Sequence, residues 1–460
     1  MWPTASQPWE CRMDKIIIEH GDLMMMKHDG ILSTTKRLKF LKAAVLLVAW
    51  AGGASAASAQ QTPPQSRIDI DQAIQLAIKH NHALKATENL IQQSEAEEIT
   101  AAIRPNPVFT YDDLYVPLFS PSQLNSSTLD NITEFDLGFT YTFERGHKRQ
   151  ARMQAARDAT AVTRSQVKDT ERGLTFNVAQ QFINVLLAKS NLEFASQDLA
   201  SFEKTVSLSE VRYKSGAMSE ADLLKIKLQT LQFQTDVSMA KLSLKQSLVS
   251  LRELLGFESV TLDYDVIGEL AYTALHGNQE DLQSLALQQR PDLLAAQQGV
   301  TAAKSQYDLA KANGKRNLST TFDYTHVSDL NSAGLTLNIE IPIFDRNQGE
   351  IARTHYAITQ ADELKSEASQ IVLTDVANAY EGAKTNDEIV LLYTSGYLQQ
   401  AKDSRDISEY AYQRGAASLL DFLDAERSYR ATQLAYRQVL ASYMLSVEQL
   451  KESVGTRNLP

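Results

Sequence analysis

The stretch of sequence that decides the fold is FDLGFTYTF, residues 135–143, in which apolar or aromatic residues alternate with polar residues or glycine. A second stretch, GLTLNIEIPI at residues 334–343, alternates in the same way. Strands of about 9–11 residues that cross a membrane need this pattern, because one face meets lipid and the other meets water. Weaker partner strands are predicted around Phe109 and Tyr111, and around Phe322 and Tyr324. An ordinary half-buried sheet has the same alternation, so other parts of the chain must separate the two interpretations.

The four predicted strands cannot close a barrel within one chain. Open sheet edges are not tolerated in lipid, so spanning strands require the chain to associate. Three chains would supply about twelve strands, which lies within the known range of barrel sizes. Residues 116–131 are predicted to form an extracellular loop between the first two strands, and residues 328–332 its shorter counterpart.

The start of the chain, residues 1–59, is predicted to be an N-terminal extension followed by a secretory signal peptide. A basic cluster at residues 36–42 precedes an apolar run at residues 43–50 and then a series of small residues at 52–59. This is the order found in signal peptides, with cleavage expected after Ala59, or after Ala56 as the alternative. A short transmembrane anchor is the competing interpretation, although the run is shorter than the about 20 residues that a span needs. The single cysteine, Cys11, lies upstream, so the sequence predicts no disulfide and no lipid anchor at the cleavage site.

The composition argues against several functional classes. The 460 residues are 43% hydrophobic and carry a formal net charge of −11, so no basic excess favours nucleic-acid binding. The sequence holds no nucleophile-elbow, zinc-protease or phosphate-loop motif, so we predict neither an enzyme nor a cofactor site. His80 and His82 are two positions apart and would not face each other on a helix, so we predict no metal site there.

Long helices are predicted between the strands. No proline occurs between Pro121 and Pro291, or between Pro342 and Pro460. Apolar and small residues recur at alternating spacings of three and four from 178 to 213, as in a coiled-coil seam. A helix over 147–214 would be about 100 Å long, and helices over 71–103 and 219–255 could stack end to end beside it. A soluble coiled-coil rod is the alternative that this pattern leaves open.

The sequence also repeats itself, which predicts a duplicated unit. Residues 76–86 resemble residues 285–295, residues 213–222 resemble 412–421, and residues 254–256 resemble 453–455. The landmarks recur in the same order, so we divide the chain into a first repeat at 60–265 and a second at 266–460. Each repeat is expected to contain a helix, two strands, a long helix, a turn and a helix.

These features together resemble the TolC-type outer membrane efflux family. The motifs that carry the resemblance are Arg104-Pro105-Asn106-Pro107, the stretch at 334–345, Tyr213-x-x-Gly216-x-x-Ser219-x-x-Asp222, and Tyr412-x-x-Gly415-x-x-Ser418-x-x-Asp421-x-x-Asp424. The resemblance covers about residues 68–456. The stretch at 146–149 is similar to the metal-efflux branch of the family. Many relatives carry a lipidation cysteine that is missing here, so the resemblance implies anchoring by the barrel alone.

The resemblance implies a mainly α protein with a small β part. Long antiparallel helices would form an α-helical barrel in a homotrimer, and four strands per chain would contribute to a twelve-stranded barrel in outer membrane lipid. The chain would then be an outer membrane channel that extends into the periplasm and acts as a passive exit duct for small toxic solutes, either drugs or metal ions. Its implied partners are a periplasmic adaptor and an inner-membrane transporter, which we expect to be of the RND type. An outlet for type I protein secretion is the alternative, and the soluble periplasmic coiled-coil protein is a third.

The resemblance also assigns roles to single residues. Asp421 and Asp424 match the gating acidic residues of the family, and their spacing of three puts both on one helix face. The turns at Gly216 and Gly415 match the periplasmic tips that meet the adaptor, together with Tyr213, Ser219, Asp222, Tyr412 and Ser418. Ser219 with Asp222, and Ser418 with Asp421, also match helix caps, which is the alternative role for Asp222 and Asp421. Asp424 has no capping role and is the better gate candidate. The two tyrosines have an equally good interpretation as core residues at helix ends.

Overall fold

The computed structural model describes residues 67–459, except residues 117, 124 and 132. The predicted signal peptide and Cys11 lie outside the described residues. The first half contains β1 (Arg67–Ile68), α1 (Ile70–His80), α2 (His82–Ala102), β2 (Val108–Leu114), η1 (Pro121–Gln123), α3 (Ser126–Asn131), β3 (Glu134–Phe143), α4 (Lys148–Lys214) and α5 (Glu220–Leu255). The predicted helix at 147–214 and the strand at 135–143 are therefore present almost to the residue.

The second half has the same order of main elements. It contains β4 (Asp265–Val266), α6 (Gln279–Gln289), α7 (Pro291–Asn313), β5 (Leu318–Val327), β6 (Leu330–Ile339), α8 (Gln348–Leu392), the π-helical segment η2 (Tyr393–Tyr397), α9 (Leu398–Gln413) and α10 (Leu419–Val454). The boundary between repeats at residue 265 stays a prediction.

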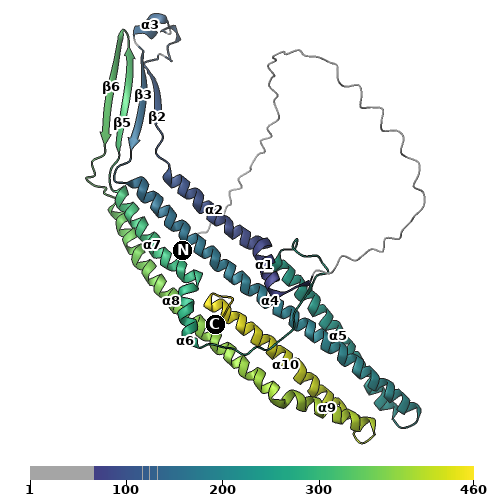
Figure 1. Ribbon diagram of the computed structural model, residues 1–460. Helices are drawn as coiled ribbons and strands as arrows, with labels where there is room; N and C mark the ends of the chain where they lie inside the picture. The colour runs from purple at the N-terminus through teal and green to yellow at the C-terminus, as the bar shows by residue number, and fades with distance from the viewer. Residues whose placement is uncertain (1–66, 117, 124, 132, 460) are drawn as a thin grey trace, which may run out of the picture. The chain divides into compact units, whose positions relative to one another are not determined.

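The four longer strands form one antiparallel sheet in the order β2-β3-β5-β6 (Figure 1). Opposite residues share a face, so Phe109, Phe139, Phe322 and Leu335 lie in one row across the sheet. The adjacent row on the other face contains Thr110, Gly138, Asp323 and Gly334. The period of two in the sequence therefore becomes one apolar and one polar face.

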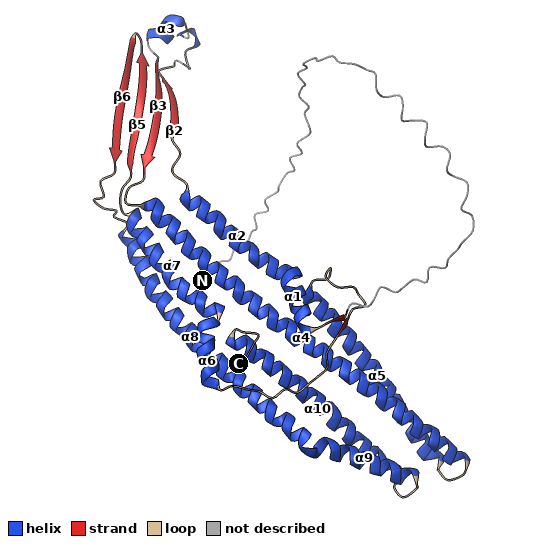
Figure 2. Ribbon diagram, in the orientation of Figure 1, coloured by secondary structure: helices blue, strands red, loops and turns tan. Residues whose placement is uncertain are grey.

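The helices pack side by side around α4, the longest of them (Figure 2). Toward the sheet, α4 contacts α2 and α7, and α7 contacts α8. Toward the tips, α4 contacts α5 and α10, and α10 contacts α8 and α9. Seam residues of α4 such as Val178 and Val185 are fully buried against α1 and α5. None of the helices in the described part of the chain is both long and apolar enough to cross a membrane.

The structure corrects four details of the sequence analysis. The helix predicted over 71–103 is broken at Asn81, whose side chain caps α2 and donates to the Leu254 carbonyl at 2.9 Å. The helix before the second tip is interrupted at η2, where Gly396 has φ +140°. The strand predicted to reach Ile343 ends at Ile339, ahead of Pro342. The loop predicted at 328–332 shortens to residues 328–329, because β6 begins at Leu330.

Candidate functional site

The first tip joins α4 to α5 through a turn of five residues, 215–219. Gly216 has φ +76°, a left-handed conformation that favours glycine. The amide of Ala217 donates to the Arg212 carbonyl at 2.8 Å and closes the end of α4. Ser219 is the N-cap of α5 and accepts from the Asp222 amide at 3.1 Å. Asp222 itself lies 3.4 Å from the ammonium group of Lys225.

The second tip repeats this geometry between α9 and α10. Gly415 has φ +77°, and the Ser418 hydroxyl accepts from the Asp421 amide at 3.2 Å. Here the cap is reciprocal, because Asp421 also accepts from the Ser418 amide at 3.1 Å. These bonds from the hydroxyl and the amide of Ser418 lower the pKa of the Asp421 carboxyl. Asp421 thus caps α10, as the sequence allowed.

The two tyrosines of the tip motifs lie in different environments. Tyr412 is only 5% exposed and stacks on Phe422 with the ring centroids 5.3 Å apart. Tyr213 is 40% exposed. The core interpretation therefore holds for Tyr412 within the chain, whereas Tyr213 presents its ring at the surface.

A single aromatic core holds the two tip hairpins together. Phe202 of α4 stacks on Phe233 of α5 at 4.3 Å and on Phe422 of α10 at 6.4 Å. Arg212 adds a polar link, because its guanidinium donates to the Tyr412 carbonyl at 2.7 Å and lies over the Tyr412 ring. Stacked rings and the guanidinium of Arg212 thus join the hairpins near the turns within one chain.

The two candidate gate carboxylates do not act as a pair within the chain. Asp421 is engaged by Ser418, while Asp424 forms an ion pair with Arg427 at 2.8 Å. Both side chains are exposed near the start of α10, so the face that carries them is open to other chains. Asp424 has no capping role in the helix, as expected from its position.

A buried acid pair in the same region was not anticipated from the sequence. Asp198 of α4 and Glu426 of α10 are 6% and 5% exposed and are hydrogen-bonded to each other. Burial, followed by the charge of Asp198, raises the pKa of Glu426 to about 8, and burial also raises the pKa of Asp198. Arg430 pairs with Asp198 at 2.6 Å and also with Asp236 of α5. The only signal in the sequence was the position of Asp198 beside the coiled-coil seam, and that signal does not reveal a partner on α10.

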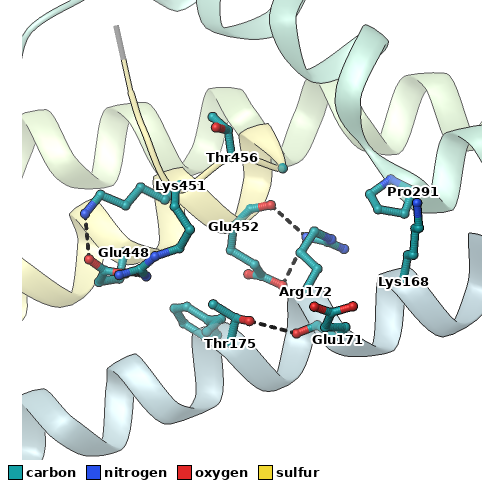
Figure 3. A pocket seen from close by; sticks show the side chains of 12 residues that line it. Lys168, Glu171, Arg172, Thr175, Pro291, Glu448, Lys451, Glu452 and Thr456 are labelled. Atoms are coloured by element: carbon teal, nitrogen blue, oxygen red, sulfur yellow. Dashed lines mark hydrogen bonds and ion pairs between the residues drawn. The ribbon is translucent and has the colours of Figure 1, made fainter. Parts of the chain in front are cut away.

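A cavity of about 350 Å³ lies farther from the tips, between α4 and the C-terminal end of α10 (Figure 3). Its lining is rich in charged residues that pair with one another. Arg172 donates to the Glu452 carbonyl at 2.8 Å, and Glu448 accepts from Lys451 at 2.7 Å and from Arg457 at 2.5 Å. Arg172 thus fastens the end of α10 to α4, whereas Glu448 holds Lys451 within α10 and Arg457 in the segment that follows it.

Metal-ligand residues do not gather in groups of three or more anywhere in the described part of the chain. His80 and His82 lie on opposite sides of the break at Asn81, at the end of α1 and the start of α2.

Residues 73–257 and 282–456 match the family model described as outer membrane efflux protein. The chain belongs to this family. It is therefore an outer membrane channel of an efflux system and not an enzyme, and it reaches from the outer membrane into the periplasm. Family membership also selects the channel over the soluble coiled-coil protein. The resemblance of the chain to the TolC-type family is thus confirmed.

Two relatives extend the match over most of the chain. The pyoverdine export outer membrane protein OpmQ of Pseudomonas putida is 25% identical over 430 residues, covering 87% of this chain and 90% of that protein. The cobalt-zinc-cadmium resistance protein CzcC of Cupriavidus metallidurans is 22% identical over 399 residues, covering 84% and 90%.

The fold is also that of a solved channel. A crystal structure of CusC, reported with the conformational changes of its folding and transmembrane channel formation, matches with a TM-score of 0.68 at 21% identity. It covers 85% of this chain and 94% of that chain. A CusC sequence from Escherichia coli is 28% identical over 276 residues, covering 56% of this chain and 59% of that protein. The mainly helical fold with a small sheet is thereby confirmed.

Proposed function

We propose that three copies of this chain form a closed duct through the outer membrane. The observation that carries the proposal is the four-stranded sheet with one apolar and one polar face, whose edge strands are β2 and β6. Pairing β2 of one copy with β6 of the next would give about twelve strands and remove the open edges. The helices would continue from this barrel as an α-helical barrel.

The mass of the purified protein in detergent tests the duct. We expect three copies per particle after removal of residues 1–59. A stable monomer in detergent would contradict the barrel, because its two sheet edges would remain unpaired.

We further propose that the two tips contact a periplasmic adaptor, which connects the duct to an inner-membrane transporter of the RND type. The surface would comprise the exposed parts of both turns, with Tyr213, Gly216, Ser219, Asp222, Gly415 and Ser418, and with Tyr412 supporting them from the core. The support is that the turns end long helices at the same end of the described unit (Figure 1).

Replacing Gly415 by valine tests this contact. A β-branched residue at φ +77° is strained, so the turn should deform. Efflux should be lost while trimer formation and membrane insertion persist. Gly382→Ala on α8 is the matched control, because the added methyl group meets nothing within 4 Å. Unchanged efflux in Gly415→Val would contradict the proposal that the tip contacts the adaptor.

We propose that Asp421 and Asp424 form an acidic ring at the periplasmic entrance when three copies assemble. Carboxylates held close together in a constriction attract multivalent cations, because a cation relieves their mutual repulsion. Single-channel conductance with a trivalent cation on the periplasmic side tests the ring. The parent should be blocked, and the double variant Asp421→Ala and Asp424→Ala should resist block. Asp222→Ala is the control, since Lys225 stands where the second carboxylate would be. Equal block of parent and double variant would leave Asp421 as a helix cap alone.

We propose small toxic solutes as the cargo. The relatives include a pyoverdine export protein and a cobalt-zinc-cadmium resistance protein, so organic molecules and metal ions both belong in the test. Survival of a deletion strain should be compared across metal salts, dyes and antibiotics. Sensitivity to none of them would contradict an efflux role for small solutes.

We also propose that the duct arose by duplication of one unit, with repeats at 60–265 and 266–460. The support is the recurring order of elements and the recurring tip geometry at Gly216 and Gly415. Expressing the two repeats as separate chains tests the division. They should reassemble into the duct if the boundary at residue 265 falls between folding units.

A further inference from the structure

Four short linkers join the strands to the helices, and together they form what we call the collar. The linkers are residues 103–107 (α2 to β2), 144–147 (β3 to α4), 314–317 (α7 to β5) and 340–347 (β6 to α8). The collar lies between the sheet and the helices in Figure 1. If the sheet spans the outer membrane, the collar lies at the membrane surface that faces the periplasm.

Hydrogen bonds join neighbouring linkers into one layer. The guanidinium of Arg152 donates to the Ile103 carbonyl at 3.0 Å and to Glu144 at 2.6 Å, which ties the first two linkers. The ammonium group of Lys148 donates to Asn317 at 2.8 Å, which ties the second linker to the third. Arg316 pairs with Asp345 at 3.1 Å, which ties the third to the fourth.

The collar concentrates positive charge in a chain whose net charge is −11. Arg152 and Arg316 are neutralised by the carboxylates just described. Four further cations are exposed and take part in no ion pair within the described part of the chain: Arg104, Arg145, Lys315 and Arg346. One of them lies in each of the four linkers, so the unpaired charge runs along the whole layer.

Exposed apolar side chains accompany these cations. Ile103 precedes Arg104, and Ile341, Ile343 and Phe344 precede Arg346; Phe344 is 90% exposed. Cations beside apolar groups at a membrane boundary match a phospholipid, because the headgroup phosphate meets the cation while the acyl chain covers the apolar side chain.

We propose that the collar binds anionic phospholipid of the leaflet that faces the periplasm. This inference rests on the proposed duct, because it requires the sheet to span the membrane. Arg104 lies at the β2 edge of the sheet and Arg346 at the β6 edge. When β2 of one copy pairs with β6 of the next in the proposed duct, these like charges come together, and an anionic headgroup between them would neutralise both.

Native mass spectrometry of the full trimer tests the collar. The protein is purified in detergent with phosphatidylglycerol or with zwitterionic phosphatidylcholine, and retained lipids are counted. The parent should retain phosphatidylglycerol preferentially. The quadruple variant Arg104→Gln, Arg145→Gln, Lys315→Gln and Arg346→Gln should lose at least about tenfold in this retention, since each cation near an anionic surface contributes roughly fivefold.

Two matched variants keep the result interpretable. Lys204→Gln, Lys241→Gln, Lys245→Gln and Lys384→Gln together remove the same charge from exposed positions on α4, α5 and α8, and should retain the lipid. The variant with Arg104→Lys, Arg145→Lys and Arg346→Lys keeps the charge of the collar and should also retain it. Equal loss of phosphatidylglycerol in the control, or its full retention in the quadruple variant, would overturn the proposal that the collar binds this lipid.

Further outcomes separate the alternatives. Inorganic phosphate in excess should not displace the lipid; displacement would mean that the collar recognises phosphate without the acyl chains. A parent that forms no trimer would refute the proposed duct itself. A trimer that retains both lipids equally would refute only the lipid proposal.

Discussion

The two tips of this protein share a sequence motif but not an environment. Both turns have a glycine near φ +76°, and both following helices begin at a serine cap. The tyrosine three residues before the glycine is 40% exposed in the first tip and 5% exposed in the second. A local motif therefore sets the turn, while contacts between distant helices decide what the same residue type does there.

The largest expected difference between the tips comes from removing the tyrosines. Tyr412→Ala deletes a buried ring that stacks on Phe422, and large-to-small changes of aromatic core residues cost about 3–5 kcal/mol. Tyr213→Ala removes a ring at the surface and should cost less than about 1 kcal/mol. Hydrogen–deuterium exchange of tip amides in the trimer reports the local opening free energy. Comparable losses in both variants would mean that another protomer covers Tyr213.

The second difference depends on pH, because only the second tip hairpin carries Glu426. Its raised pKa means that the folded protein holds the proton more tightly than the unfolded chain does. The resulting stability is fully present below the ordinary pKa of glutamate, about 4.3, and is lost as the pH rises through about 8. The pKa of Asp198 is also raised, so its contribution has the same sign.

Glu426→Gln should therefore flatten the pH dependence of the tip core between about pH 5 and pH 8. The charged groups around the pair are Arg405 of α9, Arg430 of α10 and Asp236 of α5, and the titratable phenol of Tyr429 lies beside them. Amide exchange over residues 422–430 should rise with pH in the parent, beyond its intrinsic increase, and less so in the variant. Asp424→Asn on the same helix is the exposed control. An unchanged pH dependence in Glu426→Gln would mean that a group other than Glu426 causes it.

The sequence predicted the elements far better than these contacts. The helix over 147–214 was recognisable because neither proline nor a run of glycines interrupts it, and the strand at 135–143 because its alternation is unbroken. The buried pair of Asp198 and Glu426 was not recognisable, since the two residues are 228 positions apart and each sits on a helix rich in charged residues. Periodicity reports which face of one helix is apolar, but it does not report which distant helix covers that face.

The sequence analysis also did not predict where the helices are interrupted. Asn81 ends α1 and caps α2, and the signal for this break was an asparagine within an otherwise helical pattern. Gly396 was a comparable signal for the π-helical segment η2. Neither residue interrupts the period of apolar positions, so a prediction based on that period continued the helix through both. The roles of Asp421 and Asp424 at a gate still depend on the arrangement of three chains.

A moderate difference between the tips is expected from Arg212, which has no equivalent in the second tip. The corresponding position there is Ala411, and Arg430 of α10 contacts α4 and α5 farther from the turns. Arg212→Met removes the bond to the Tyr412 carbonyl, and bonds from charged groups contribute about 1.5–3 kcal/mol. Exchange over residues 409–417 should accelerate more than exchange over 215–222. Lys214→Met, two positions away and exposed, is the control, and equal acceleration in both variants would contradict the link.

The smallest difference is expected from the serine caps, where the two tips are most alike. Ser219 and Ser418 accept from the amide three residues on at 3.1 and 3.2 Å. Replacing an N-cap serine by alanine costs about 1 kcal/mol, and this cost depends on the first turn of the helix alone. Ser219→Ala and Ser418→Ala should therefore loosen α5 and α10 by similar amounts, as read from exchange of the first helical turn. Ser→Thr at either position retains a capping oxygen and should restore most of the protection. If Ser418→Ala costs several times more than Ser219→Ala, the buried ring of Tyr412 and the aromatic core behind it depend on the cap, and the separation between local motif and distant contact fails at the second tip.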